Sequence, residues 1–554
     1  MTLAVRTAPF LAGGPLYESY ITSFAAGQPD APLRGLFDHP PTVAGASARA
    51  EKLATDYRGD RQALAASLVG YNRRIGAPAP ALAAAGRLAE PGALAVVAGQ
   101  QAGLLTGPAY AIYKAAGAIA LARRLAVELE RPVVPVFWAA TEDHDLAEAD
   151  HAWVLNSAET WQRLRFQPSS PAEGLSVGAV SLAGRSREAV LSDLGASLPA
   201  GRVAAGVLEM AAATGREAGT LGEWFCRLLA AIFGPQGLVI LDPMEPALRR
   251  LAAPGVVAAL TNQAALASAL AQGLASVGQL GFAPQLDPGT SDAHVFFYPE
   301  GPGGPRRALI RTAAGFGLRD AVGDQWAPSQ LCELAAADPE RFSGSVVTRP
   351  LFQDHMLPTV AYMAGPGEIA YYAALGGCYR TVGLTMPVIW PRPSYTVVEP
   401  AVAHMLRKQG LVEPDLPAAL EAAEEAAVRA HDELSVERTF DELDVRIDEA
   451  YGPVLAAAGR VDEVLGKLAE QNRRRVRRET RWLRRKAWQV ARQRAATARA
   501  QLGRVRTHLW PNDGPQERTA CGLYFLARLG LGFAADLTEV APEPPLGHHY
   551  LYVG

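Results

Sequence analysis

The chain has 554 residues, of which 49% are hydrophobic and 20% are charged, and its formal net charge is -3. This composition excludes a disordered chain, and the length predicts roughly two to four domains. The chain does not open on a basic segment followed by an apolar run, no apolar stretch approaches membrane-spanning length, and the four cysteines lie far apart. We therefore expect a cytoplasmic protein without a membrane anchor, a disulfide framework or a zinc site.

The start of the chain predicts helices, and a Rossmann-like core follows them. Residues 1–90 carry Ala, Leu and Arg at helical spacing, which indicates an N-terminal helical region. Residues 91–395 then alternate between strand and helix, with an apolar run at 94–98, a helix over 108–129 and an apolar run at 133–138. A strand, helix, strand unit makes its strands parallel, and parallel sheets are covered on both faces. The predicted fold class is therefore α/β, with a doubly wound core.

The rest of this core is predicted to hold more strands and two insertions. Three further apolar runs are predicted as core strands: residues 152–155, 238–241 and 386–390. The strand and helix rhythm is lost near residues 157–218, which we interpret as one insertion. A second lies near residues 285–345, where the runs 294–298 and 307–311 flank a Gly- and Pro-rich turn and predict a β-hairpin.

Residues 396–510 predict a long antiparallel coiled coil. Apolar or small residues recur there at alternating steps of four and three, which is typical of a coiled-coil seam: Val461, Leu465, Leu468, Asn472, Val476, Leu483, Ala487 and Val490. A partner helix is predicted over 416–447, with a break at Gly452-Pro453 before the second helix. We expect the arm to form a homodimer, and residues 511–554 to pack back on the core.

Arg and Lys concentrate on the same arm, between residues 473 and 506. Such a run can bind a polyanion, but on a coiled coil it is usually a solvated face, and no aromatic platform accompanies it. Nucleic-acid binding is therefore not expected, although a coiled-coil protein that binds RNA or an acidic partner remains an alternative.

The first candidate site is the glycine-punctuated segment at residues 99–108, between a strand and a helix. Ligands of doubly wound folds bind at this edge of the sheet. Gln100 and Gln101 offer amide groups, Thr106 offers a hydroxyl, and Gly107 permits close backbone approach. The segment matches neither the dinucleotide fingerprint nor a Walker phosphate loop, so a tight turn is the alternative.

The second candidate is the ionisable run Glu142, Asp143, His144 and Asp145, which follows a predicted buried strand. Like charges gathered at a strand end are costly unless they bind something or pair with cations. His144 could act as a general base oriented by a carboxylate, and Mg²⁺ is conceivable, although no ligand set is fixed. Helix capping by Asp143 or Asp145 and ordinary ion pairing are the structural alternatives.

The third candidate spans residues 347–371. Arg349 could bind a carboxylate with its two-pronged guanidinium, and Gly365 and Gly367 could bring backbone amides against a ligand. The alternative is a loop whose glycines serve only to turn the chain.

Taken together, these segments resemble the cysteine-adding enzymes of bacillithiol synthesis. The match runs in order through residues 97–108, 113–114, 132–138, 142–145, 348–350, 357–359, 365–368, 386–387, 391–392, 516–518 and 550–553. It covers nearly the whole chain, and the ordered set is far more specific than any one segment. The resemblance implies a Rossmann-type core with connecting-peptide insertions, similar to class I aminoacyl-tRNA synthetases, and an arm used in dimerisation.

The resemblance also implies a reaction, in which the carboxyl group of cysteine acylates the amine of glucosaminyl-malate in the last step of bacillithiol synthesis. Gln100, Gln101, Thr106 and Gly107 would then line the site together with residues 142–145, while Arg349 and Glu368 orient the substrates. The family is associated with an adenine nucleotide, ATP or ADP, near the base of the coiled coil. The residues implied there are Trp510, Gln516, Glu517 and Arg518.

One feature of the class I synthetases is missing from the sequence. The chain contains neither the HIGH signature nor a clear KMSKS loop. The route that activates the carboxylate is therefore left open, and an adenylyl-transferring relative of the synthetases that acts on another acid is the enzymatic alternative.

Overall fold

The computed structural model describes residues 3–8, 13–25, 31–287, 292–320, 324–411, 418–430, 432, 435–541 and 547–554. The chain forms two compact units, residues 1–397 with 511–554 and residues 398–510. The β-sheets belong to the first unit, whereas the second is built from helices.

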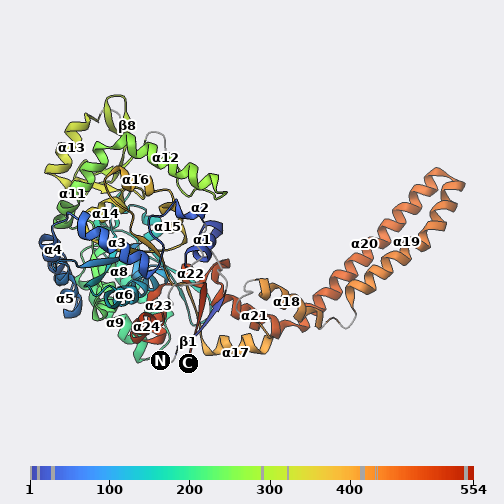
Figure 1. Ribbon diagram of the computed structural model, residues 1–554. Helices are drawn as coiled ribbons and strands as arrows, with labels where there is room; N and C mark the ends of the chain where they lie inside the picture. The colour runs from blue at the N-terminus through green and yellow to red at the C-terminus, as the bar shows by residue number, and fades with distance from the viewer. Residues whose placement is uncertain are drawn as a thin grey trace. The chain divides into compact units, whose positions relative to one another are not determined.

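The core of the first unit is a parallel sheet of five strands in the order β13-β12-β2-β3-β6. The strands are β13 (Val388–Pro391), β12 (Thr359–Ala364), β2 (Leu94–Gln101), β3 (Val133–Ala140) and β6 (Val239–Leu241). Helix α6 (Tyr110–Glu128) connects β2 to β3, and helices surround the sheet (Figure 1). The predicted Rossmann-like α/β core is confirmed. Strand β12, which pairs with β13 and β2, was not predicted, because it lies within the segment that we interpreted as a site loop.

Both faces of this sheet are buried, as the apolar runs in its strands require. Along β2, Val96 and Ala98 pack into one hydrophobic core, while Ala95 and Val97 point into the other. Helix α6 covers the first face, and α11 (Pro246–Thr261) contributes to the core on the second. The sheet is therefore covered in the manner of a doubly wound fold.

The N-terminal region contains helices α3 (Val43–Asp56), α4 (Arg61–Arg74) and α5 (Ala79–Arg87). The first two begin after capping side chains, since the side chains of Thr42 and Asp60 accept hydrogen bonds from Gly45 N and Ala63 N. The region also contains a strand that was not predicted. Strand β1 (Leu3–Ala8) pairs antiparallel with β15 (His548–Val553), and β15 in turn lies beside β14 (Tyr395–Val398).

The strand predicted at residues 152–155 forms, but it does not join the core sheet. Strand β4 (His151–Leu155) pairs antiparallel with β5 (Trp161–Arg165) in a separate sheet of two strands. Only the short helix α7 (Leu146–Ala149) separates β3 from β4. A parallel crossover needs a dozen or more residues, so β4 is too close in sequence to return to the sheet. Helices α8 (Ser186–Ser197) and α9 (Arg202–Glu217) follow in the same insertion.

The predicted hairpin in the second insertion is confirmed. Strands β7 (Asp292–Phe297) and β8 (Arg307–Thr312) pair antiparallel. They belong to a sheet of five strands in the order β10-β9-β8-β7-β11, whose other strands are Gln325–Trp326, Gly315–Leu318 and Phe342–Gly344 for β10, β9 and β11. Helix α14 (Arg349–Met356) begins shortly after β11. This insertion therefore leads directly into the segment that carries Arg349.

Among the described residues, no single helix is long and apolar enough to cross a bilayer. Helices α11 and α12 (Gln263–Gln279) reach that length and apolarity only as a pair, and they bend by 81° at their junction.

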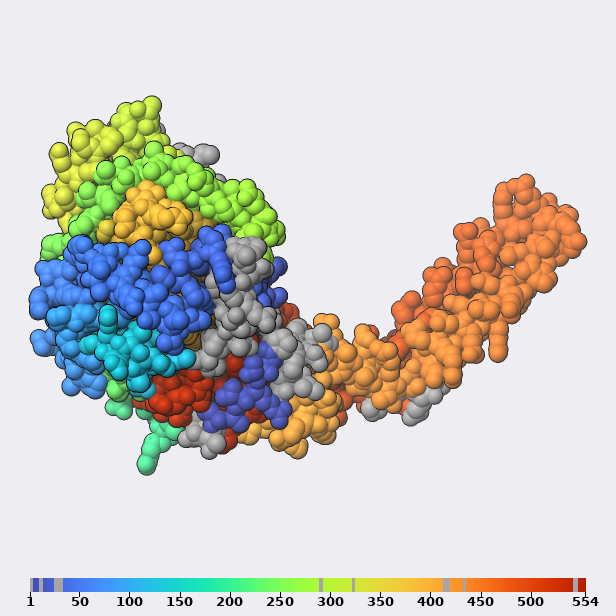
Figure 2. All heavy atoms as spheres, viewed as in Figure 1, coloured from blue at the N-terminus to red at the C-terminus, as the bar shows by residue number. Residues whose placement is uncertain are grey.

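The second unit is dominated by a helical hairpin, which confirms the predicted coiled-coil domain. Helices α19 (Val436–Val461) and α20 (Glu463–Arg494) run side by side (Figures 1 and 2). The break predicted at Gly452-Pro453 is wrong, because α19 continues through Pro453 and the chain turns at Asp462. The Asp462 carboxylate accepts hydrogen bonds from Val464 N and Leu465 N and so caps the start of α20. The Pro453 side chain has no acceptor that could cap a helix in this way. The start of the partner helix predicted from residue 416 falls outside the described residues.

Only part of the predicted seam faces the partner helix. Asn472 of α20 accepts a hydrogen bond from Tyr451 OH of α19, whereas Val461, Leu468 and Leu483 are 76%, 54% and 52% exposed. Arginines of α20 also face α19, and the ion pairs include Arg473 with Asp448 and Arg484 with Asp441. The packing of the two helices therefore combines ion pairs with buried residues of α19 such as Phe440 and Ile447, and it leaves an apolar stripe exposed.

Candidate active site

A cavity of about 530 Å³ opens at the carboxyl ends of β2, β3 and β12. This is the edge where doubly wound folds bind their ligands, and the volume suits a small molecule. All three segments singled out from the sequence contribute to its lining: Gln100, Gln101, Glu142, Asp143, His144, Arg349, Gly365, Gly367 and Glu368. The three segments therefore lie around one cavity.

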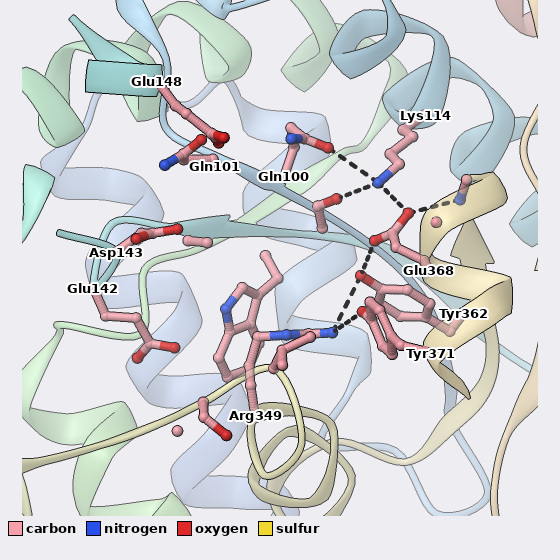
Figure 3. Close-up of a pocket in the computed structure, with 18 of the residues that line it drawn as sticks. Gln100, Gln101, Lys114, Glu142, Asp143, Glu148, Arg349, Tyr362, Glu368 and Tyr371 are labelled. Carbon is pink, nitrogen blue, oxygen red and sulfur yellow. Dashed lines mark hydrogen bonds and ion pairs between the residues drawn. The ribbon is translucent and has the colours of Figure 1, made fainter. Parts of the chain in front are cut away.

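A buried ion pair lies on one wall of the cavity (Figure 3). Nζ of Lys114, on α6, lies 2.5 Å from Oε2 of Glu368 and donates to the Gly99 carbonyl at 2.8 Å and to Gln100 Oε1 at 3.1 Å. Glu368, on α15 (Pro366–Tyr372), accepts from Tyr362 OH at 2.8 Å. Burial alone would raise the pKa of Glu368, but the Lys114 ammonium outweighs it and holds that pKa below its ordinary value.

The sequence interpretation did not assign Lys114 to the site. Its signal was a lone lysine within an otherwise apolar first half of α6, at a position that is now seen to be 3% exposed. A cation is rarely buried without a partner, so that pattern alone could have indicated a carboxylate nearby.

Arg349 lies at the start of α14 and extends into the cavity (Figure 3). Its guanidinium donates to Gln353 Oε1 at 3.0 Å and to Tyr371 OH at 3.2 Å, and it stacks over the ring of Tyr362. Among the described residues, no carboxylate lies within ion-pair distance of it. A guanidinium held by neutral groups in a cavity is suited to bind the carboxylate of a ligand.

Glu142 follows β3 and is only 6% exposed. Burial raises the pKa of its carboxyl, although Arg306, Arg249 and Arg349 oppose that shift. None of the described residues donates a hydrogen bond to this carboxylate. A buried acid in that state is expected to take a cation from a ligand.

The neighbours of Glu142 have different roles. Asp143 is half-buried at the cavity, and its Oδ1 accepts from Asp145 N at 3.1 Å. Asp145 is exposed, lies outside the cavity lining and caps α7 by accepting from Glu148 N at 3.3 Å. The capping alternative therefore describes Asp145 in this structure.

His144 is turned toward the β7–β8 insertion. Arg306 donates to its Nδ1 at 3.2 Å, and burial together with the Arg306 charge lowers its pKa. Because Arg306 is a donor, Nδ1 must accept, so the proton of the neutral ring lies on Nε2. His144 therefore presents an N–H donor in this geometry and not a free basic nitrogen.

Thr106 and Gly107 lie away from the cavity. Thr106 is fully buried, and its Oγ1 accepts from Leu523 N at 3.1 Å, while the Gly107 carbonyl accepts from Gly522 N at 3.1 Å. Thr106 has a φ of 127°, a strained value for a residue with a side chain. These two residues therefore anchor the C-terminal segment in the structure, although the sequence placed them in the substrate site.

The residues implied in nucleotide binding do not form one group. Trp510 ends α21 (Ala496–Leu509) in the second unit, whereas the other three belong to the first. The Gln516 side chain is bonded to both N and O of Val397, and Glu517 forms a buried bidentate pair with Arg392. Arg518 is exposed and lines the main cavity. Gln516 and Glu517 are thus occupied internally and do not fit an adenine nucleotide.

The next feature is the grouping of side chains that could bind a metal ion. Within the described ranges, no three His, Cys, Asp or Glu side chains are grouped so that they could hold a metal ion. The carboxylates of Asp143 and Glu148 both line the cavity, but they are not part of such a group.

The comparisons with known proteins divide the chain near residue 394, close to the first boundary between the two units of the fold. The Rossmann-like N-terminal domain of the bacillithiol biosynthesis protein BshC matches residues 6–393, and its C-terminal coiled-coil domain matches residues 395–553. The chain belongs to the BshC family. A relative from Heliobacterium modesticaldum is 38% identical over 91% of this chain and 92% of its own, and one from Symbiobacterium thermophilum is 35% identical over 90% and 91%. Both carry the name "Putative cysteine ligase BshC".

Membership of the BshC family makes the chain a ligase-family protein of bacillithiol biosynthesis. Part of the basic run on its arm is neutralised, since Arg473 pairs with Glu470 and Asp448, and Arg477 pairs with Asp444 and Asp448. These arginines already have acidic partners, which does not favour the RNA-binding alternative.

Proposed function

We propose that this protein joins the carboxyl group of cysteine to the amine of glucosaminyl-malate, which forms an amide and completes bacillithiol. One observation carries the proposal. A single cavity holds Arg349, which has no acidic partner among the described residues, together with the carboxylates of Glu142 and Asp143 (Figure 3). A site for this reaction must hold carboxylate and amine groups together. The guanidinium of Arg349 can bind a carboxylate, and the two acids can bind an amine.

The half-buried Asp143 is our candidate for the base. The acceptor amine must lose a proton before its nitrogen attacks the activated carbonyl carbon of cysteine. Asp143 takes that proton, the new C–N bond forms, the activating group leaves with the carboxyl oxygen, and a second N–H proton passes to solvent. Arg306 and Arg518 also line the cavity and supply positive charge for the malyl carboxylates of the acceptor.

We further propose that the reaction depends on a nucleotide. A free carboxylate and an amine do not condense at neutral pH without activation of the carboxylate. The support for this point is this chemical requirement alone. Gln516 and Glu517 do not fit the nucleotide that the resemblance implied. No residue of the chain is therefore assigned to the nucleotide, and Mg²⁺ is proposed only as its counter-ion.

We also propose that the protein is a homodimer paired through α20. On α20 the stripe of Leu465, Leu468, Leu483 and Val490 is 43% to 54% exposed and repeats at coiled-coil spacing, and Val461 at the end of α19 continues it with 76% exposure. A second copy of the same stripe would cover it, and this pairing is favourable because it removes exposed apolar surface from water.

The decisive experiment is mass-spectrometric detection of bacillithiol after the purified full-length chain is incubated with glucosaminyl-malate and cysteine. Parallel reactions contain or lack magnesium-ATP. Product only in the presence of ATP supports both the ligase and its nucleotide dependence. Product without ATP removes the nucleotide from the proposal, and no product from folded protein in any mixture contradicts the proposed reaction.

A further inference from the structure

A second, much smaller cavity lies beside the main one. Its volume is about 20 Å³, and it shares Trp138, Glu142, Gly344 and Arg349 with the main cavity. That space is enough for roughly one water-sized group. The small cavity is therefore a side pocket of the main one, and we call the boundary that the two share, with Glu142 and Arg349, its entrance.

The interior of the side pocket is mainly apolar. Two helices and one strand supply its apolar walls: Leu248, Ala252 and Val256 from α11, Phe342 from β11, and Phe352 and Met356 from α14. The one charged group besides the entrance, Arg249, donates to the carbonyls of Pro243 and Phe342. Arg249 is thus committed to the backbone, and the pocket presents a surface for a small apolar group.

Three polar groups at the entrance lack a partner of complementary charge or hydrogen-bonding type among the described residues. No described residue donates to the carboxylate of Glu142 or offers a carboxylate to Arg349, as shown above. The indole of Trp138 is 3% exposed, and its Nε1–H has no hydrogen-bond acceptor in the described part of the chain. Buried polar groups are normally satisfied, so an acid, a cation and a donor left open at one entrance point to a ligand.

We propose that the side pocket and its entrance form the amino-acid subsite. Arg349 binds the α-carboxylate, Glu142 binds the α-ammonium group, and the side chain of the amino acid enters the pocket between α11 and α14. The inference rests on the proposed function in taking cysteine as the amino acid. Ala252, Val256 and Met356 then set the size of the accepted side chain and so act as specificity-determining residues.

The chemistry of the pocket favours a thiol over its competitors. A thiol is a small, polarisable group that hydrogen-bonds weakly, so an apolar wall receives it at little cost. The hydroxyl of serine loses its hydrogen bonds with water there, and a longer side chain does not fit. We expect 2-aminobutyrate to compete with cysteine, serine to bind on the order of tenfold more weakly or worse, and methionine and leucine not to compete.

The test is equilibrium dialysis of radiolabelled cysteine against the full-length chain under reducing conditions, with and without glucosaminyl-malate and magnesium-ATP. Ala252→Leu fills the pocket, and its matched control is Ala253→Leu, which makes the same change on the next residue of α11, outside both cavities. We expect Ala252→Leu to weaken cysteine binding at least tenfold and Ala253→Leu to bind like the wild type. Wild-type affinity in Ala252→Leu, or no binding by the wild type in any mixture, overturns the inference.

A second variant keeps the test decisive if Ala252→Leu fails to fold. Val256→Ala enlarges the pocket, so homocysteine, which does not fit the wild type, should bind to it within tenfold of cysteine. Unchanged rejection of homocysteine contradicts the placement of the side chain. The mixtures that lack glucosaminyl-malate measure binding without turnover. Cysteine that binds there but is never joined to glucosaminyl-malate in the complete mixture would contradict the proposed reaction and leave the subsite standing.

Discussion

The ammonium of Lys114 lies 2.5 Å from the carboxylate of Glu368, and the two side chains are 3% and 18% exposed. The pair joins α6, which follows β2, to α15, which follows β12. These two strands are neighbours in the core sheet, so the pair fixes one wall of the cavity at their carboxyl ends. Tyr362 donates to the same carboxylate at 2.8 Å and accepts a hydrogen bond from the guanidinium of Arg349 at 3.4 Å, and so connects Arg349 to the pair.

Removing one member of this pair should destabilise the fold strongly. In Lys114→Met the carboxylate of Glu368 stays buried without its cation, so we expect a loss of about 3 to 5 kcal/mol in the free energy of unfolding. Urea denaturation of the wild type and the variant measures it. The double variant Lys114→Met with Glu368→Gln should recover part of the loss, because it removes both charges. A single variant as stable as the wild type would contradict a buried, coupled pair.

Sequence reasoning located the neighbourhood of this site but not its centre. The acidic run after β3 and Arg349 were visible because charges stood at the ends of apolar segments. The roles of Lys114 and Trp138 were not visible, because each looks like an ordinary core or helix residue until strand order is known. Strand β12 brings the two sides together, and its pairing with β2 is a contact between residues more than 250 positions apart that local pattern cannot encode.

The acidic run itself offers a prediction with an internal control. Asp143 lines the cavity, whereas Asp145 caps α7 from outside it. We expect Asp143→Asn to lower the rate of bacillithiol formation at least a hundredfold with little change in stability, because it removes the proposed base. Asp145→Asn should keep the rate. Initial rates measured by mass spectrometry, with thermal unfolding of both variants, check this. Equal effects of the two substitutions on the rate would contradict the separate roles.

The fold shows a similar division between what periodicity predicts and what it leaves open. The coiled-coil spacing in α20 is real, but periodicity does not say which surface covers an apolar stripe. The acids of α19, such as Asp441 and Asp448, pair with arginines of α20, and the leucines of the stripe stay exposed. The turn at Asp462 was not predicted for a related reason. Gly452-Pro453 is the stronger helix-breaking signal in the sequence, but α19 continues through Pro453 and the Asp462 carboxylate caps α20.

The outward stripe predicts how the dimer can be broken. Leu468→Glu and Leu483→Glu place charges on exposed positions that the second copy would cover, so the double variant should be a monomer. Sedimentation-equilibrium measurements of the wild type and the double variant give the mass in solution. Glu463→Gln, on the same helix but within an exposed ion pair with Lys467, is the control and should stay dimeric. A wild type that is monomeric at all concentrations would contradict dimerisation through α20.

Glu142 links the amino-acid subsite to the stability of the whole protein. Its pKa is raised by burial, so the folded chain keeps this proton at pH values where the unfolded chain, with a pKa of about 4.3, has lost it. The contribution of this group to stability is therefore present below the unfolded pKa and is lost as pH rises through the folded pKa. Above that point the buried charge penalises folding fully.

Glu142→Gln removes the charge and with it the pH dependence. We expect the variant to be more stable than the wild type by about 1 kcal/mol at pH 8, and the difference to shrink toward pH 4. Urea denaturation at both pH values measures it, and dialysis should show that the same variant has lost cysteine binding. A difference that grows as pH falls would mean that Glu142 is stabilised as a carboxylate by the protein itself. In that case its charge would not be held open for the α-ammonium group of a ligand.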